Sequence, residues 1–292
     1  MGISVEILPK AVVLVTTTPP QADSDLLGGC ILRSAIGEVP EDPYQESEIV
    51  TTDGYGPFTR KLAVYGITLI ALDEVRDRFM NRVAQTIKEI FHRDETMNLE
   101  LQEEMIKNLY RYKTTIPILQ GEDMSFVEDD KAIWSRLRNE NTICDYIMDQ
   151  GEVSGQVMEV VEHLLHNISN VGLHHTFPVD WGLSRRSKLW EAMQAAVENG
   201  YYDIAFVEDI DEQSVHDRLI LQEFAYWFIS TAWNLQESYG AIDEEEWTIK
   251  HAAELQAKFP DFYRIYEQTV CKVMVAPSDP TLKIFGPTTT DT

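Results

Sequence analysis

The segment Leu219–Asn234 constrains the fold of this chain more than any other, because it reads LILQEFAYWFISTAWN and is apolar almost all round at helical spacing. A helix without a polar face must be covered on every side, so we expect this segment to lie at the centre of the core. Its only charged residue is Glu223. A buried carboxylate is costly unless it is neutral, ion-paired or bound to a metal ion. The candidate ion-pair partners are Arg185, Arg186 and Arg218.

Glu223 shares one stripe of the predicted helix with other residues that can form hydrogen bonds, namely His216, Tyr226, Ser230 and Asn234. Residues at such spacing lie one above another on a helix face. The stripe therefore predicts a polar seam inside the core rather than a single stray charge.

Histidines are concentrated between residues 163 and 175, where four of the seven occur. The helix predicted over Val153–Asn170 has an apolar face, and its opposite face carries Glu159, Glu162, His163 and His166. Glu162 and His166 are one turn apart and can bind one metal ion together. The same holds for Glu159 and His163. The alternative is an amphipathic helix whose polar face is solvated.

This combination resembles the gluzincin metallopeptidases, whose signature is HExxH on one helix and a glutamate ligand on a later helix. Glu162-His163-Leu164-Leu165-His166 is similar to that signature with its first two residues exchanged. Glu223 is followed by Phe-Ala-Tyr-Trp-Phe, which resembles the downstream glutamate helix of the lethal-factor-like branch. The resemblance covers residues 153–238 and implies a zincin-like fold for the helical part of the chain.

The resemblance implies a Zn²⁺ site with His166 and Glu223 as ligands and Glu162 in the place of the first ligand. His163 occupies the place of the general base, so either Glu162 or His163 would handle the proton. The family's mechanism needs a carboxylate beside the metal as proton acceptor, and a carboxylate ligand makes zinc a weaker Lewis acid. The chain is therefore either a divergent zincin or a relative that kept the fold and lost the chemistry.

Two further residues complete the predicted site. His175 could join the metal ligands from the loop after the helix, because Gly172 lets the chain turn back. Tyr226 lies close to Glu223 on the predicted helix and is the candidate for stabilising an oxyanion. If Glu223 and His166 share one ion with bonds of about 2.0–2.2 Å, their side chains should converge to within roughly 5 Å.

The charge of the chain disfavours several classes of partner. Lys plus Arg is 24 and Asp plus Glu is 49, which gives a formal net charge of −25. Such a surface repels phosphate backbones and anionic lipids, so we expect no nucleic-acid and no membrane partner. A peptide is the expected substrate, and the sequence identifies no protein partner. Because a basic n-region and a run of about 18 apolar residues are both missing, we expect a soluble protein of the cytoplasm, or of a virion or other particle.

The three cysteines, Cys30, Cys144 and Cys271, are widely spaced and odd in number. Such a set predicts no disulfide framework and a reducing compartment. Cys144 is expected to be a core residue.

Hydrophobic periodicity predicts an α+β fold with a small N-terminal β part and a mainly helical C-terminal part. We expect residues 1–60 to be a β-rich extension packed on the core, with a strand at Ala11–Val15 and a loop over residues 37–58. Residues 61–292 form the mainly helical core domain, which begins with one buried strand at Leu62–Leu72. The other predicted elements are a strand at Thr114–Leu119 and helices at Asp73–Phe91, Leu99–Tyr110, Val153–Asn170, Lys188–Glu198, Val215–Leu235, Glu245–Lys258 and Phe262–Val273.

Taken together, these features predict a metallopeptidase-like, zinc-dependent hydrolase with a divergent motif. Two alternatives remain open. One is a non-catalytic structural or interaction protein, such as an assembly component of a particle. The other is a metal-binding protein without turnover.

Overall fold

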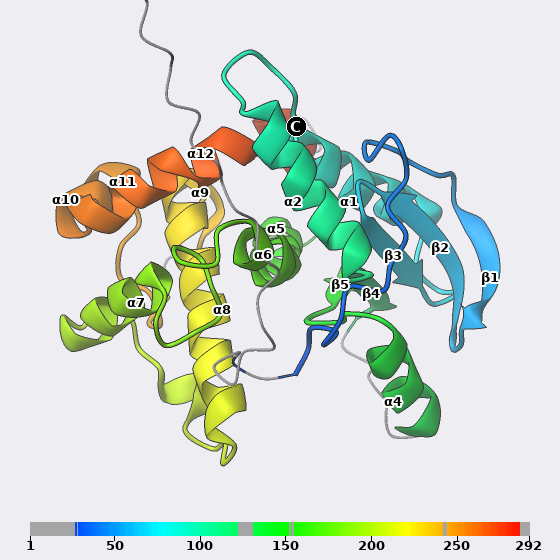
Figure 1. The fold of residues 1–292 in the computed structure, drawn as a ribbon, viewed down its shortest axis with the longest axis horizontal. Helices are drawn as coiled ribbons and strands as arrows, with labels where there is room; N and C mark the ends of the chain where they lie inside the picture. The colour runs from blue at the N-terminus through cyan, green and yellow to red at the C-terminus, as the bar shows by residue number, and fades with distance from the viewer. Residues whose placement is uncertain are drawn as a thin grey trace, which may run out of the picture.

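A mixed five-stranded sheet belongs to the first half of the chain (Figure 1). Its strands, in spatial order, are β1 (Val50–Tyr55), β2 (Phe58–Val64), β3 (Ile67–Ala71), β4 (Thr115–Gln120) and β5 (Ile147–Asp149). β1, β2 and β3 are antiparallel neighbours, whereas β3, β4 and β5 run parallel. The computed structural model describes residues 27, 29–121, 131–151, 153, 155–241 and 244–286, so the strand predicted at Ala11–Val15 lies outside them.

The single strand predicted over Leu62–Leu72 is wrong, because the chain reverses inside it. β2 and β3 form a hairpin in which Val64 pairs with Ile67. The turn residues Tyr65 and Gly66 have φ angles of 47° and 82°. Tight hairpin turns favour positive φ at both central residues, and the apolar residues on either side concealed this one in the sequence.

The predicted boundary after residue 60 falls inside β2, and β1 forms within the stretch predicted as a loop over residues 37–58. Both strands pair into the same sheet as β3. Residues 50–60 therefore belong to the core sheet. Strands and helices are interleaved through the first half, and the predicted α+β class is confirmed.

Helices cover both faces of this sheet. α1 (Asp77–Ile90) packs against β2 and β3, and α5 (Gln156–Asn167) packs against β5. α4 (Lys131–Glu140), which the sequence analysis did not predict, covers the other face. Side chains alternate along β3, so Leu69 joins the main core while Ile70 joins the smaller cluster beneath α4.

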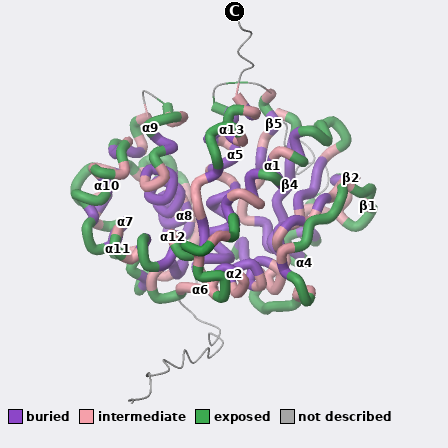
Figure 2. Tube along the Cα trace, turned by 90° about the horizontal axis from the view of Figure 1, so that it is seen from above, coloured by how far each residue is buried: buried purple, intermediate pink, exposed green. Residues whose placement is uncertain are grey.

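α8 (Gln213–Ala232) runs through the second half of the fold, and Figure 2 shows it buried along much of its length. This confirms the central position predicted for Leu219–Asn234. Phe224 and Phe228 are fully buried, and burial of such a side chain stabilises the fold by roughly 1.5–3 kcal/mol. The other helices of this half are α7 (Lys188–Glu198), η2 (Ala205–Val207), α9 (Leu235–Tyr239), α10 (Ala252–Lys258), α11 (Pro260–Gln268), α12 (Val270–Val273) and α13 (Asp279–Lys283).

Two predicted helices of this half differ from the observed ones. The helix predicted over Glu245–Lys258 is shortened to α10, because Trp247 and Ile249 lie in a non-helical segment that buries their side chains completely. The helix predicted over Phe262–Val273 is divided at Thr269 into α11 and α12. Among the described residues, no helix combines the length and the hydropathy that a membrane span requires.

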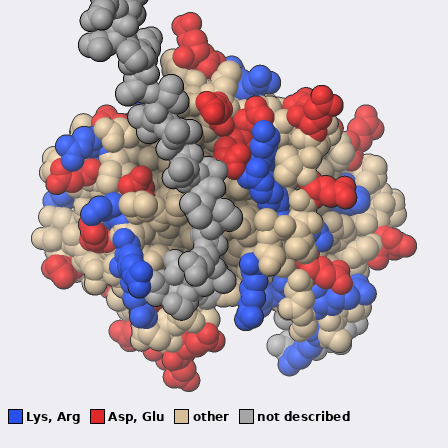
Figure 3. All heavy atoms as spheres, in the orientation of Figure 1, with Lys and Arg blue, Asp and Glu red and all other residues tan. Residues whose placement is uncertain are grey.

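Acidic side chains are dispersed over the face shown in Figure 3, with lysines and arginines among them. On this face the large negative net charge is therefore not gathered into a single patch.

Candidate metal centre

The clustered histidines lie on one continuous helical stretch. α5 is followed without a break by a π-helical turn, η1 (Ile168–Leu173), and by α6 (His174–Thr176). The polar face predicted for this helix is not solvated, since His166 is 1% exposed. It contacts the loop before β5 and also α8. The alternative of a solvated amphipathic face is therefore wrong.

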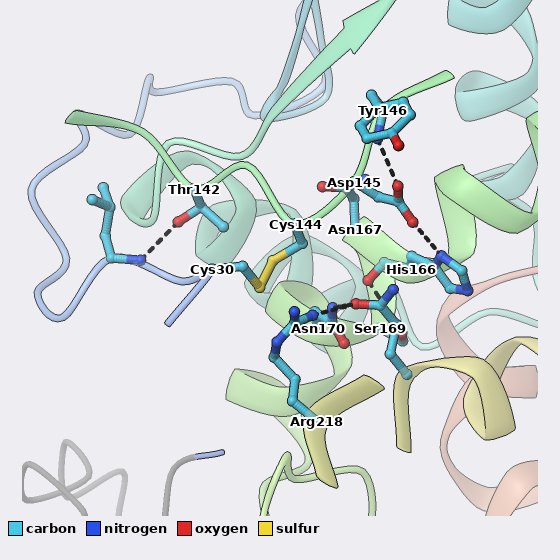
Figure 4. Close-up of a disulfide and its surroundings, with 12 residues drawn as sticks. Cys30, Thr142, Cys144, Asp145, Tyr146, His166, Asn167, Ser169, Asn170 and Arg218 are labelled. Atoms are coloured by element: carbon cyan, nitrogen blue, oxygen red, sulfur yellow. Dashed lines mark hydrogen bonds and ion pairs between the residues drawn. A yellow bond between two sulfur atoms is a disulfide. The ribbon is translucent and has the colours of Figure 1, made fainter. Parts of the chain in front are cut away.

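Asp145 contacts both histidines of α5 from the loop that precedes β5. Figure 4 shows its contact with His166. Its Oδ2 lies 2.6 Å from His166 Nδ1, which donates a hydrogen bond to it. The same oxygen lies 2.9 Å from His163 Nδ1, but out of line for a hydrogen bond. His163 Nε2 lies 3.2 Å from Glu159 Oε1, so this imidazole is held between two carboxylates.

Cys144, the residue before Asp145, forms a disulfide with Cys30 (Figure 4). The prediction of no disulfide is therefore wrong, and the argument for a reducing compartment loses its basis. The two cysteines are 114 residues apart in the chain, and only folding brings them together. Their spacing in the sequence therefore gives no sign that they pair. Cys271 is a free cysteine.

The other ring nitrogen of His166 faces α8. His166 Nε2 lies 3.1 Å from Glu223 Oε2, which confirms the predicted convergence of these two side chains. Glu162 lies one turn before His166 on α5. Glu162, His166 and Glu223 each offer one ligand atom, and these atoms all lie within 4.8 Å of one another.

Two of the three arginines expected as partners of Glu223 have other contacts. Arg185 forms an ion pair with Asp217. Arg218 donates a hydrogen bond to Gln222 at 2.8 Å. Neither of these contacts is an ion pair with Glu223, whose charged neighbour is instead His166 at 3.1 Å.

Two sets of potential metal ligands share His166. One set adds Asp145 and His163, and the other adds Glu162 and Glu223. In the set with His163, Asp145 is only 2.6 and 2.9 Å from the two imidazole nitrogens. Ligands of a tetrahedral zinc ion, with bonds of about 2.0–2.2 Å, lie roughly 3.3–3.6 Å apart. These short contacts are therefore those of a hydrogen bond and an ion pair. The 3.1 Å between His166 Nε2 and Glu223 Oε2 is also a hydrogen-bond distance, and it would have to lengthen slightly around a zinc ion. In the set with Glu162 and Glu223, the imidazole offers Nε2 while Nδ1 is held by a carboxylate, which is the usual arrangement of a metal-binding histidine.

Charges within the site shift its pKa values. Burial alone would lower the pKa of His166, but the Glu223 carboxylate and the hydrogen bond to Asp145 outweigh it and raise the pKa to about 10. Burial and the charge of Glu223 raise the pKa of Glu162 to about 7. Despite burial, His163 and His166 hold the pKa of Asp145 well below its usual range. The site thus retains extra protons at neutral pH, which a divalent cation would replace.

A cavity of about 680 Å³ opens beside this group. Glu162, Glu223 and Tyr226 line it, and His166 lies beneath them. His163 does not belong to the lining. The structure thus brings three of the predicted site residues to the cavity and His166 into contact with Glu223, whereas His163 lies between Asp145 and Glu159.

His175 is not brought to this group. Its ring stacks on Tyr112 with 3.7 Å between the centroids, and burial lowers its pKa to about 2. The chain does not turn back at Gly172, because the helix continues through η1. Gly172 instead allows close packing on α2 (Leu99–Arg111), since a Cβ there would lie 2.8 Å from Met105 Cε.

The polar seam predicted along α8 is present in part. Tyr226 is 2% exposed, and its hydroxyl accepts a hydrogen bond from Gln236 Nε2 at 3.2 Å. Ser230 Oγ accepts a second bond from the same amide at 2.9 Å. His216 and Asn234 lie at the two ends of the helix and do not join this seam. His216 contacts Asp217, and the Asn234 side chain accepts a hydrogen bond from the Ala252 backbone N–H.

Asp145, Gln236 and Glu246 belong to the site but were missed by the sequence analysis. Asp145 and Glu246 come from loops, and Gln236 comes from the five-residue helix α9. Such segments have no hydrophobic periodicity, so the sequence does not indicate which of their side chains point into the fold. Glu246 accepts a hydrogen bond from Trp227 Nε1 at 2.8 Å, and burial raises its pKa to about 7.

Comparison of the chain with protein-family models, with curated proteins and with solved structures finds no match. The interpretation of the site therefore rests on its own geometry.

Proposed function

We propose that this protein is a zinc-dependent, metallopeptidase-like hydrolase whose metal ion is bound by Glu162, His166 and Glu223. One observation carries the proposal. Three ligand atoms from two packed helices lie within 4.8 Å of one another, and two of the three residues, Glu162 and Glu223, line a cavity of about 680 Å³. Ligands that converge beside an open cavity suit a catalytic metal, which needs a free position for substrate.

The residues of the group fit a zinc ion. Asp145 holds His166 Nδ1, so the ring presents Nε2 to the other two ligands. No residue of the described part of the chain forms a hydrogen bond or an ion pair with the Glu162 carboxylate, so its charge has no direct partner of its own. A bound zinc ion would supply that partner, and it would also supply Lewis acidity to a substrate carbonyl.

Two further side chains have roles in this proposal. The buried hydroxyl of Tyr226 is fixed by Gln236 and can donate its proton to an oxyanion in the cavity. Glu162 lines the cavity and is the better placed of the two predicted proton acceptors, since His163 lies between Asp145 and Glu159. Glu162 is a ligand in the proposed site, and the alternative is that it acts as proton acceptor while His166 and Glu223 bind the metal ion.

A metal-binding protein without turnover is the second candidate. It is favoured by the ligand set itself, in which two carboxylates donate negative charge and weaken the Lewis acidity of zinc. A non-catalytic structural or interaction role is the third, and it predicts no metal at all.

Elemental analysis and peptide digestion test the proposal together. Protein purified without chelator should contain about one zinc ion per chain, as one ligand group implies. It should cleave a mixed peptide library, read by mass spectrometry, and chelator should abolish cleavage. Zinc without cleavage would support the second candidate, and no zinc even after soaking would refute both metal-based candidates.

Glu162→Gln separates the two roles of Glu162. If Glu162 is a ligand, this variant loses zinc affinity and activity together. If it is the proton acceptor, the variant keeps its zinc and loses only turnover.

A further inference from the structure

The cavity wall is acidic beyond the three proposed ligands. Five glutamates line the cavity, and its described lining contains no lysine, arginine or histidine. Glu162 and Glu223 are proposed metal ligands, which leaves Glu159, Glu244 and Glu246. Glu159 forms an ion pair with His163, whereas Glu244 and Glu246 accept hydrogen bonds from neutral groups of the chain. Glu244 and Glu246 are therefore the carboxylates that remain for a cationic ligand.

Gln236 adds a fixed hydrogen-bond acceptor to the same wall. The residue is 3% exposed and belongs to the cavity lining. Its amide nitrogen donates to Tyr226 and Ser230, so the carbonyl oxygen Oε1 is its other polar atom. No described residue donates a hydrogen bond to Oε1. Gly240 lies directly beside this oxygen, because a Cβ at that position would be only 2.5 Å from it.

Aromatic rings complete the wall. Tyr226, Trp227 and Tyr239 line the cavity. The rings of Tyr226 and Trp227 are 4.7 Å apart, and Trp227 Nε1 donates to Glu246 Oε1 at 2.8 Å. Carboxylates, an amide carbonyl oxygen and aromatic faces all attract hydrogen-bond donors that carry positive charge.

We infer that the cavity binds a ligand through a protonated amine, with Glu244, Glu246 and Gln236 as acceptors and Trp227 as the aromatic face. The inference rests on the proposed function in that it names the substrate class of the same cavity, a peptide with an ammonium group. That group is either the free amino terminus or a lysine side chain. The binding of the amine itself needs no metal ion.

Calorimetric titration with paired probes tests this inference. N-acetyl-lysine amide is compared with the same molecule acetylated on its side chain, and leucine amide is compared with N-acetyl-leucine amide. Each pair differs in one positive charge. With chelator present and at low salt, we expect at least one charged probe to bind roughly tenfold more tightly than its neutral partner. The preference should shrink as ionic strength rises, because the carboxylates are partly exposed to solvent.

Variants locate the binding group. Glu244→Gln keeps the acceptor for the Glu246 backbone N–H, and Glu246→Gln keeps the acceptor for Trp227. Both variants should therefore fold, which melting curves verify, and both should reduce the preference for the charged probe several-fold. Glu198→Gln, on the exposed end of α7, is the matched control and should leave it unchanged.

The outcomes separate this inference from the proposed function. Charge preference that depends on Glu244 or Glu246, in a protein that binds no zinc, supports the amine site and refutes the hydrolase. Zinc-dependent cleavage without any preference between paired probes supports the hydrolase and refutes the amine site. Equal affinities within both pairs, or an equal loss in Glu198→Gln, would overturn the inference.

Discussion

His166 Nδ1 donates a hydrogen bond to Asp145 at 2.6 Å, and the opposite nitrogen of the same ring lies 3.1 Å from Glu223. A carboxylate on one side of an imidazole fixes the tautomer and the orientation of the other side. The loop before β5 therefore contributes to a site whose proposed ligands are all on α5 and α8. Asp145 also neighbours the disulfide between Cys30 and Cys144, which anchors this loop.

Asp145→Asn should weaken zinc binding without removing a ligand. The amide can keep a hydrogen bond to His166 but loses the negative charge that makes the imidazole a stronger donor to the metal. We expect affinity to fall by roughly 10- to 100-fold, measured by competition with a zinc-binding dye. Asp261→Asn on the surface is the control, since Asp261 is exposed and pairs with Arg264. Unchanged affinity in Asp145→Asn would show that Asp145 does not act through His166.

Breaking the disulfide should destabilise the fold. A crosslink over 114 residues removes much conformational entropy from the unfolded chain, so Cys30→Ser should lower the free energy of unfolding by roughly 3–5 kcal/mol in urea titrations. Reduced wild type should have the same urea midpoint as Cys30→Ser. Cys271→Ser should have the same urea midpoint as oxidised wild type. A reductant without effect on the wild-type midpoint would mean that the disulfide does not form.

Two glycine variants test the hairpin between β2 and β3. Gly66 and Gly200 both have positive φ, 82° and 69°. A Cβ at Gly66 would lie 2.8 Å from the Ile106 carbonyl oxygen, whereas nothing lies within 4 Å of one at Gly200. Gly200→Ala should cost about 1–2 kcal/mol from backbone strain alone. Gly66→Ala should cost about 1–3 kcal/mol more, from overpacking. Equal losses of unfolding free energy for the two variants would mean that Gly66 is not in the tight turn between β2 and β3.

Acid should destabilise the fold through His174. Burial lowers the pKa of this residue to about 4, and its Nδ1 accepts the N–H of Leu183 at 3.0 Å. The unfolded chain, with a histidine pKa of about 6.5, binds more protons than the native state as pH falls below 6.5, so stability is lost there. Between pH 7.5 and 5 this one residue should contribute a loss of up to about 2 kcal/mol.

His174→Asn isolates that contribution, because the asparagine oxygen can accept the same hydrogen bond without titrating. Urea midpoints at the two pH values should differ less for this variant than for the wild type, while exposed His92→Asn behaves as wild type. The same pH dependence in all three proteins would contradict the assignment.

The helices were predictable from the sequence where one apolar period extends over several turns. α7 has the predicted bounds, and the buried centre of α8 follows from a segment without a polar face. The hairpin was not predictable, because Tyr65 and Gly66 interrupt an apolar run for only two residues. α4 was missed because it buries only Leu137.

The convergence of His166 with Glu223 was predictable, since one costly carboxylate and one imidazole-bearing face each need a partner. Asp145 and the disulfide beside it depend on a loop whose position is set by tertiary contacts, namely the parallel pairing of β4 with β5 and the bridge between Thr114 and Thr142. His175 was misplaced because Gly172 could serve a turn or a close helix contact, and only the packing on Met105 decides between them.

The most direct test of the proposed metal centre compares wild type with Glu223→Gln in melting curves, each with saturating zinc and with chelator. Zinc at about 100 times its dissociation constant stabilises the fold by roughly 2.7 kcal/mol. For a chain of 292 residues, whose entropy of unfolding is about 0.6 kcal/mol/K, that corresponds to a rise in Tm of about 4–5 °C. We predict this rise for the wild type and for Glu198→Gln, and less than half of it for Glu223→Gln. Equal zinc-induced shifts in wild type and Glu223→Gln would contradict the assignment of Glu223 as a ligand.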